Sequence, residues 1–232
     1  LLFRTSRYLM AQVFPDAVFK AYKKKGDELL KTDRAWLKHY IRYRARRGWG
    51  EFDSLCYLMP EWECLTNLYD YSRDPELKKS AGMMLDLLLV DMAVDSLNGL
   101  YGGAHGRIYA RHALDHANGN TYPLQYLYFG NVDRQSLMPS SRRAKGMLVD
   151  ALVSSYRPSE IVLAIALGRK TPYENRERKH LHNPSDIMPE RPVKGSIRKY
   201  TFWTPEYVMG CVQLQDLYPQ SCPGKWYAHH EQ

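Results

Sequence analysis

The residues best suited to chemistry follow a glycine pair within residues 100–116, LYGGAHGRIYARHALDH. His105 can titrate near neutral pH, Arg107 is a permanent bidentate donor to a carboxylate, and Tyr109 is a weak acid. Glycine pairs let the backbone turn through positive φ or approach a ligand closely. We expect these three side chains to bind an acidic substrate and move a proton. The alternative is a helix C-cap followed by loop residues that hydrogen-bond locally.

A second polar group lies in residues 48–57, GWGEFDSLCY, where helical periodicity is broken. Glu51 and Asp53 are two residues apart, so an extended backbone directs both carboxylates to one face. Paired carboxylates can hydrolyse glycosides as acid and base or nucleophile. We expect this pair to line one cleft with the three residues above, because both groups fall in glycine-marked breaks that flank one predicted helical hairpin.

Two other patterns are compatible with metal binding, and neither is specific. His112 and His116 lie four residues apart with Asp115 beside them, on one face if the segment is helical, but no catalytic glutamate accompanies them. None of the cysteines forms a C-x-x-C pair; they are Cys56, Cys64, Cys211 and Cys222. We expect no metal and no cofactor. The cysteines are expected to be free thiols, or to form disulfides if the protein is exported.

The chain is basic and carries a substantial apolar fraction. Of its 232 residues, 44% are hydrophobic, which excludes a wholly disordered chain, and 33 Lys and Arg exceed 25 Asp and Glu for a formal charge of +8. This excess favours an acidic partner. No apolar run has the length of a membrane span, and no helix-turn-helix, zinc-finger or RNA-recognition signature is present, so we expect neither membrane insertion nor nucleic-acid binding.

Helical periodicity in the sequence predicts the helices that position these polar groups. It predicts a helix that Asp33 caps and Gly48 ends, a helix from Pro60, and a long helix from Leu77 to Ala93 that Asp74 caps. The last two form an antiparallel hairpin across a short D-P-E turn. These patterns indicate a mainly α fold built of antiparallel helical hairpins.

The C-terminal part differs in kind. Residues 169–196 are rich in Pro, Arg, His and Asn and are expected to form a long loop. Tyr200, Phe202 and Thr204 alternate as in a strand, and a second strand can follow Tyr207, so we expect a β-hairpin. We therefore divide the chain into a helical domain, residues 1–195, and a small C-terminal β element with its tail, residues 196–232.

The order of several short motifs resembles the α/α-toroid domain of polysaccharide-degrading enzymes of the heparinase and alginate-lyase type. The motifs are E-F-D-S-x-x-Y (51–57), N-x-x-D (67–70), GGAHGR-x-Y (102–109) and Y-T-x-x-T-P-E-Y (200–207). This resemblance implies helical hairpins stacked around a cleft, followed by a β-sandwich. A full ring of six hairpins needs a longer chain, so an incomplete toroid, or a fragment that a further domain or chain completes, is expected.

The resemblance also implies residue roles. The Asn-His pair common in those lyases is absent, because Ala104 precedes His105, and neutralisation of the substrate charge would fall to Asn67, Arg107 or Asn183. Aromatic faces with a polar edge suit sugar rings, so we assign substrate contacts to the neighbouring aromatic residues. These are Trp49, Tyr57 and Tyr101.

The leading hypothesis is cleavage of an acidic, uronate-containing polysaccharide by β-elimination. This reaction needs a base, a cation to hold the carboxylate and an acid for the leaving oxygen. His105 is the candidate base or charge neutraliser, Tyr109 the candidate proton donor or base, and Arg107 the cation that holds the carboxylate. The alternatives are a glycoside hydrolase using Glu51 and Asp53, and a non-catalytic helical protein that binds polyanions. No signal peptide is recognisable, and the expected location is secreted or periplasmic, with any signal already removed.

Overall fold

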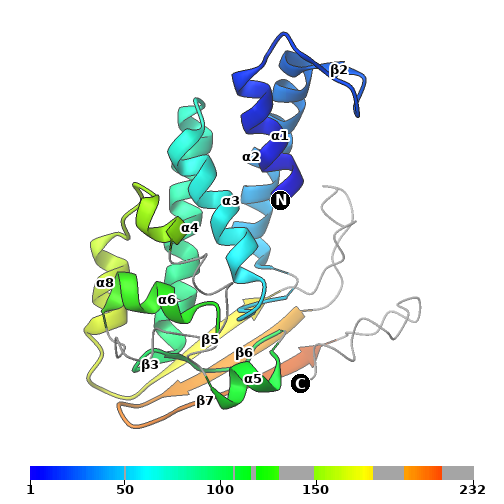
Figure 1. Ribbon diagram of the computed structural model, residues 1–232. Helices are drawn as coiled ribbons and strands as arrows, with labels where there is room; N and C mark the ends of the chain where they lie inside the picture. The colour runs from blue at the N-terminus through cyan, green and yellow to red at the C-terminus, as the bar shows by residue number, and fades with distance from the viewer. Residues whose placement is uncertain (50, 107, 116–118, 131–148, 180–195, 216–232) are drawn as a thin grey trace.

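The computed structural model describes residues 1–49, 51–106, 108–115, 119–130, 149–179 and 196–215, and the fold is mainly helical, as predicted (Figure 1). At the N-terminus, α1 (Leu2–Val13) and α2 (Gly26–Arg47) are joined by a short hairpin of β1 (Val18–Phe19) and β2 (Lys24–Lys25). Acidic residues in the first turn of α2 complement the positive end of its dipole.

Asp33 does not cap a helix, and this expectation was wrong. It lies inside α2, fully buried, and its carboxylate accepts hydrogen bonds from Arg4 (2.7 Å) and Arg7 (2.6 Å) of α1. A buried carboxylate needs such partners, so this residue joins the two helices instead of starting the second.

The second hairpin follows the sequence prediction. It consists of α3 (Leu58–Tyr71) and α4 (Pro75–Asp95), side by side and joined by a short turn (Figure 1). The side chain of Asp74 caps α4 by accepting from the backbone N–H groups of Glu76 (2.9 Å) and Leu77 (3.3 Å). The apolar stripe of α4 is buried in the core, as its periodicity predicts.

Shorter elements follow α4. They are the β3 (Ser96–Leu97) and β4 (Leu100–Tyr101) pair, the helices α5 (Ala110–Leu114) and α6 (Tyr122–Leu124), the π-helical turn η2 (Gln125–Phe129) and α8 (Glu160–Leu167). Of these, α8 packs on α4.

A three-stranded antiparallel sheet forms the C-terminal part, in the order β5 (Tyr173–Lys179), β6 (Ser196–Trp203) and β7 (Val208–Gln215). The predicted hairpin is confirmed as β6 and β7. However, residues 173–179 form a strand where a loop was expected, and the sheet therefore begins before residue 196.

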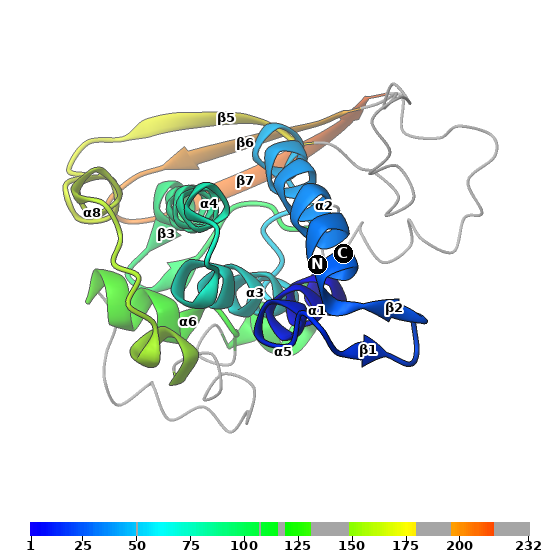
Figure 2. The ribbon, with the colours of Figure 1, turned by 90° about the horizontal axis from the view of Figure 1, so that it is seen from above.

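The sheet and the helices form layers (Figure 2). The sheet lies along one side, α8, α4 and part of α2 lie next to it, and α1, α3 and α6 lie farther away. The core between the helices centres on Trp62, Leu65, Leu85 and Leu89, all fully buried. Among the described helices, none has the length and apolarity needed to cross a membrane.

Candidate active site

The two glycine-marked breaks meet in space. The backbone N–H of Gly106 donates to the carbonyl of Phe52 at 2.8 Å, and a Cβ on Gly106 would lie 2.8 Å from the Phe52 nitrogen. Only glycine permits this approach. The segments carrying Glu51, Asp53 and His105 are therefore in contact, although some fifty residues separate them.

Both ring nitrogens of His105 face backbone carbonyl oxygens. Nδ1 lies 2.7 Å from the oxygen of Asp53, and Nε2 lies 3.0 Å from that of Tyr101. Burial and the nearby Lys199 ammonium lower the pKa of His105, whereas the two carbonyl contacts act to raise it. The single N–H of the neutral ring can donate to only one of these carbonyls, but both nitrogens are directed at protein backbone and neither is presented to a substrate.

A cluster of charged side chains lies beneath these loops, between α4 and the sheet. Lys199 of β6 has its Nζ 2.5 Å from Asp53 Oδ2 and 3.3 Å from Glu177 Oε1, and it also bonds Asp95. The cluster joins the sheet, α4 and the loop after α2.

The second lysine of the cluster is Lys179 of β5. Its Nζ lies 2.6 Å from Glu177, 2.7 Å from Asp91 and 3.5 Å from Asp53. The described cluster therefore contains four carboxyl groups and two ammonium groups, so full ionisation would leave an excess of two negative charges.

The pKa values of the carboxyl groups in this cluster shift in different directions. Burial acts to raise the pKa of Asp53, but Lys179 and Lys199 together lower it below its ordinary value. Burial outweighs the lysine contacts at Asp91 and raises its pKa to about 6, and burial also raises the pKa of Asp95. These two groups therefore take up a proton more readily than an ordinary aspartate, which would relieve the excess charge.

Three carboxylates of the cluster have the spacing of metal ligands. Oxygen atoms of Asp53, Asp95 and Glu177 lie within 4.8 Å of one another. The ammonium of Lys199 bonds all three, so it already supplies a positive charge at this position. The alternative histidine site is described only at His112, because His116 lies outside the described residues.

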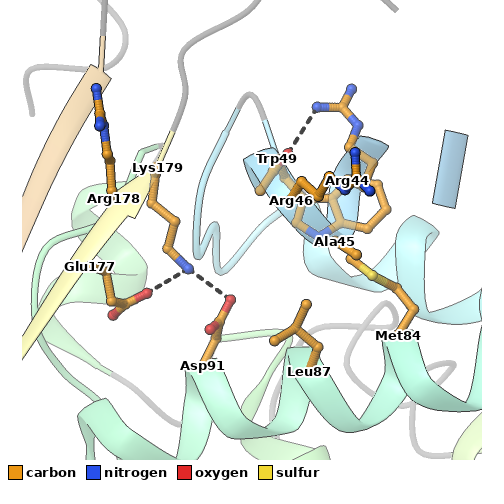
Figure 3. A pocket seen from close by; sticks show the side chains of 11 residues that line it. Arg44, Ala45, Arg46, Trp49, Met84, Leu87, Asp91, Glu177, Arg178 and Lys179 are labelled. Carbon is orange, nitrogen blue, oxygen red and sulfur yellow. Dashed lines mark hydrogen bonds and ion pairs between the residues drawn. The ribbon is translucent and has the colours of Figure 1, made fainter. Parts of the chain in front are cut away.

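A pocket of about 210 Å³ adjoins the cluster (Figure 3). It lies between the end of α2, α4 and β5, where Lys179 reaches toward Asp91. Its lining includes two further cationic residues, Arg44 and Arg46, and the ring of Trp49; Arg44 is buried, with its guanidinium 5.3 Å from the centre of that ring. The pocket thus combines cations, an aromatic face and a carboxyl group of raised pKa, and this combination makes it the candidate site.

The other face of the sheet carries a larger hollow of about 580 Å³. Because strand side chains alternate, Arg178 points away from Glu177 and Lys179 (Figure 3). It lies directly opposite Arg198 on β6, and both residues are exposed. The hollow is also lined by Arg176, Tyr200 and Gln213.

The remaining residues predicted from the sequence are dispersed. Tyr109 is 45% exposed and contacts Arg111 and His112. Tyr57 is exposed at the start of α3, and the exposed Asn67 donates within α3 to the carbonyl of Glu63. Among the predicted substrate contacts, Trp49 lines the pocket and Tyr101 is buried, which raises the pKa of its hydroxyl. Arg107 and Asn183 lie outside the described residues.

Sequence reasoning missed the residues that complete the cluster: Asp91, Asp95, Glu177, Lys179 and Lys199. One signal was available, because Asp91 and Asp95 are four residues apart in the mostly apolar second half of α4. Such a pair needs a cationic partner when the helix is buried. Comparison of the chain with known family models, curated proteins and solved structures finds no match.

Proposed function

We propose that this protein acts on a uronate-containing polysaccharide and cleaves it by β-elimination at the pocket beside Asp91. The observation that carries the proposal is a carboxyl group with a pKa of about 6 in a pocket whose lining also includes the cationic residues Arg44, Arg46 and Lys179. A group with this pKa exchanges a proton near neutral pH, and the cations suit a substrate carboxylate.

Four side chains that line the pocket take part in the proposed reaction. Arg46 and Lys179 bind the uronate carboxylate and stabilise the negative charge that develops on it when the neighbouring carbon loses its proton. Asp91 accepts that proton, a carbon–carbon double bond forms, the glycosidic carbon–oxygen bond breaks, and the leaving oxygen takes a proton from solvent. The face of Trp49 contacts the sugar ring. The volume is below the roughly 300 Å³ at which typical small-molecule pockets begin, so one sugar unit is the expected occupant.

The proposal transfers the role of base from His105 to Asp91. The ring nitrogens of His105 are engaged by carbonyl groups, whereas Asp91 borders the pocket. The lowered pKa of Asp53 keeps its carboxyl group ionised, so it has no proton to give a leaving group, which does not favour hydrolysis by the pair Glu51 and Asp53. The roles of Arg107, Tyr109 and Asn183 stay predictions.

We further propose that the helical hairpins are part of an incomplete α/α toroid, which a longer chain or a partner completes. A polymeric substrate is consistent with a secreted or periplasmic protein. The guanidinium groups on the outer face of the sheet would bind flanking acidic sugars of the same polymer.

The test is incubation with alginate, heparan sulfate, hyaluronan and polygalacturonate, with dextran as a neutral control. The ultraviolet absorbance of the unsaturated product would be recorded. We expect this absorbance to rise with at least one acidic polymer and not with dextran. New reducing ends without absorbance would indicate hydrolysis, and binding without cleavage would indicate a non-catalytic polyanion-binding protein; both results contradict the proposal.

A further inference from the structure

A second group of reactive side chains lies apart from the pocket, where α5 contacts the loop before α3. The sulfur of Cys56 is 3.3 Å from Nδ1 of His112. On the other side of the ring, Nε of Arg111 donates to Nε2 of His112 at 3.0 Å. The proposed elimination uses none of these three residues.

The arginine fixes the proton position on the histidine. A guanidinium has only donors, so Nε2 must offer its lone pair, and the single N–H of a neutral imidazole is then on Nδ1. Burial and the charge of Arg111 lower the pKa of His112, which keeps the ring neutral near pH 7. The N–H on Nδ1 therefore points at the sulfur of Cys56.

This arrangement favours the anionic form of the sulfur. An N–H donor stabilises a thiolate far more than a thiol, and the positive charge of Arg111 lies just beyond the ring. Cys56 is half-buried, so small reagents have access to it.

We propose that Cys56 is a nucleophilic thiol that small peroxides oxidise, with His112 and Arg111 as positioning residues. In this step the sulfur attacks one peroxide oxygen, an S–O bond forms, and the O–O bond breaks. The leaving hydroxide takes a proton from solvent and departs as water. Sulfur is oxidised to a sulfenic acid and the peroxide is reduced.

The chain contains its own controls for this proposal. Cys211 is exposed and Cys64 is buried, and burial raises the pKa of the Cys64 thiol to about 11. An ordinary thiol is only a few per cent ionised at pH 7, so a thiolate-stabilising site should react about tenfold faster.

The experiment is competitive alkylation of the folded protein with iodoacetamide at pH 7, followed by mass spectrometry of each cysteine peptide. Cys56 should react about tenfold faster than the more exposed Cys211, and Cys64 should react slowest. Hydrogen peroxide with dimedone should label Cys56 first. Equal or slower reaction of Cys56 relative to Cys211 would overturn the proposal.

Variants of Arg111 test its role as a positioning residue. Arg111→Gln removes the charge and lets the histidine tautomer exchange, so alkylation of Cys56 should slow several-fold while that of Cys211 is unchanged. Arg111→Lys, which keeps a cationic donor, should retain most of the rate. Lys79→Gln, at an exposed position of α4, is the control for charge. An unchanged Cys56 rate in Arg111→Gln would exclude the assigned role, and circular dichroism would verify folding of each variant.

Discussion

The ammonium of Lys199 lies 2.5 Å from the carboxylate of Asp53, although 146 residues separate them in the chain. Lys199 is on the middle strand of the sheet, and Asp53 is in the loop that precedes α3. Both side chains are buried, so each depends on the other for charge compensation. This pair therefore couples the sheet to the loops of the helical layer.

Lys199→Met should destabilise the fold by about 3–5 kcal/mol at pH 7, because it leaves buried carboxylates with less compensating charge. Urea denaturation would measure the change. The matched control is Arg198→Met on the same strand. Because this side chain is exposed, its replacement should change the free energy of unfolding by only about 0.5 kcal/mol. Similar denaturation midpoints for the two variants would show that the cluster does not hold the sheet in place.

Asp91 should make stability depend on pH in a defined window. Its pKa is raised to about 6 in the folded protein and is about 3.9 in an unfolded chain, so the folded state binds more protons between these values. The contribution of this group to stability therefore falls as pH rises from about 4 to 6. Thermal denaturation across this range should show a flatter decline for Asp91→Asn than for the wild type. An identical pH dependence in both proteins would rule out the raised pKa.

Gly210→Ala should destabilise the protein by roughly 1–3 kcal/mol, as overpacking does. An added Cβ would lie 2.5 Å from Gly103 Cα and 2.6 Å from the Ala104 nitrogen, and backbone atoms cannot move away as a side-chain end can. Chemical denaturation would be compared with that of Met209→Ala, the exposed neighbour on β7. If the glycine variant is as stable as this control, the loop around Gly103 does not pack on the strand.

Arg198→Gln should weaken binding of an acidic polysaccharide and leave stability unchanged or slightly increased. Arg178 and Arg198 lie directly opposite across two strands, and like charges in this position repel unless an anion lies between them. Affinity would be measured at two salt concentrations against Lys79→Gln, an exposed residue of α4 with the same charge change. Equal affinities of the Arg198→Gln and Lys79→Gln variants for the polysaccharide would show that binding depends only on net charge.

The sequence predicted the elements that follow a single apolar pattern. The Asp74-Pro75 start and the 3.6-residue period of α4 are local signals, and so is the alternation around Tyr200 in β6. The glycines indicated that the loops of Asp53 and His105 lie near each other, and the shared cleft stays a prediction.

The sequence did not reveal β5, for a physical reason. Glu174, Arg176 and Arg178 face outward, while Asn175, Glu177 and Lys179 face inward, so both faces of the strand are polar. The inward-facing Lys179 is paired with Glu177 on the same strand, with Asp91 on α4 and with Asp53 in the loop after α2. The last two partners come from distant segments, and no local pattern indicates them.

The most direct measurement of the central claim is the elimination rate of Asp91→Asn on the most readily cleaved uronate polymer, followed by product absorbance. The matched control is Asp95→Asn, which also neutralises a cluster carboxyl of raised pKa but does not line the pocket. Both variants would be assayed below their unfolding temperatures. Loss of the proton acceptor should lower kcat of Asp91→Asn by about 10²- to 10⁴-fold, while Asp95→Asn keeps most of the wild-type rate. Wild-type turnover by Asp91→Asn would contradict the account.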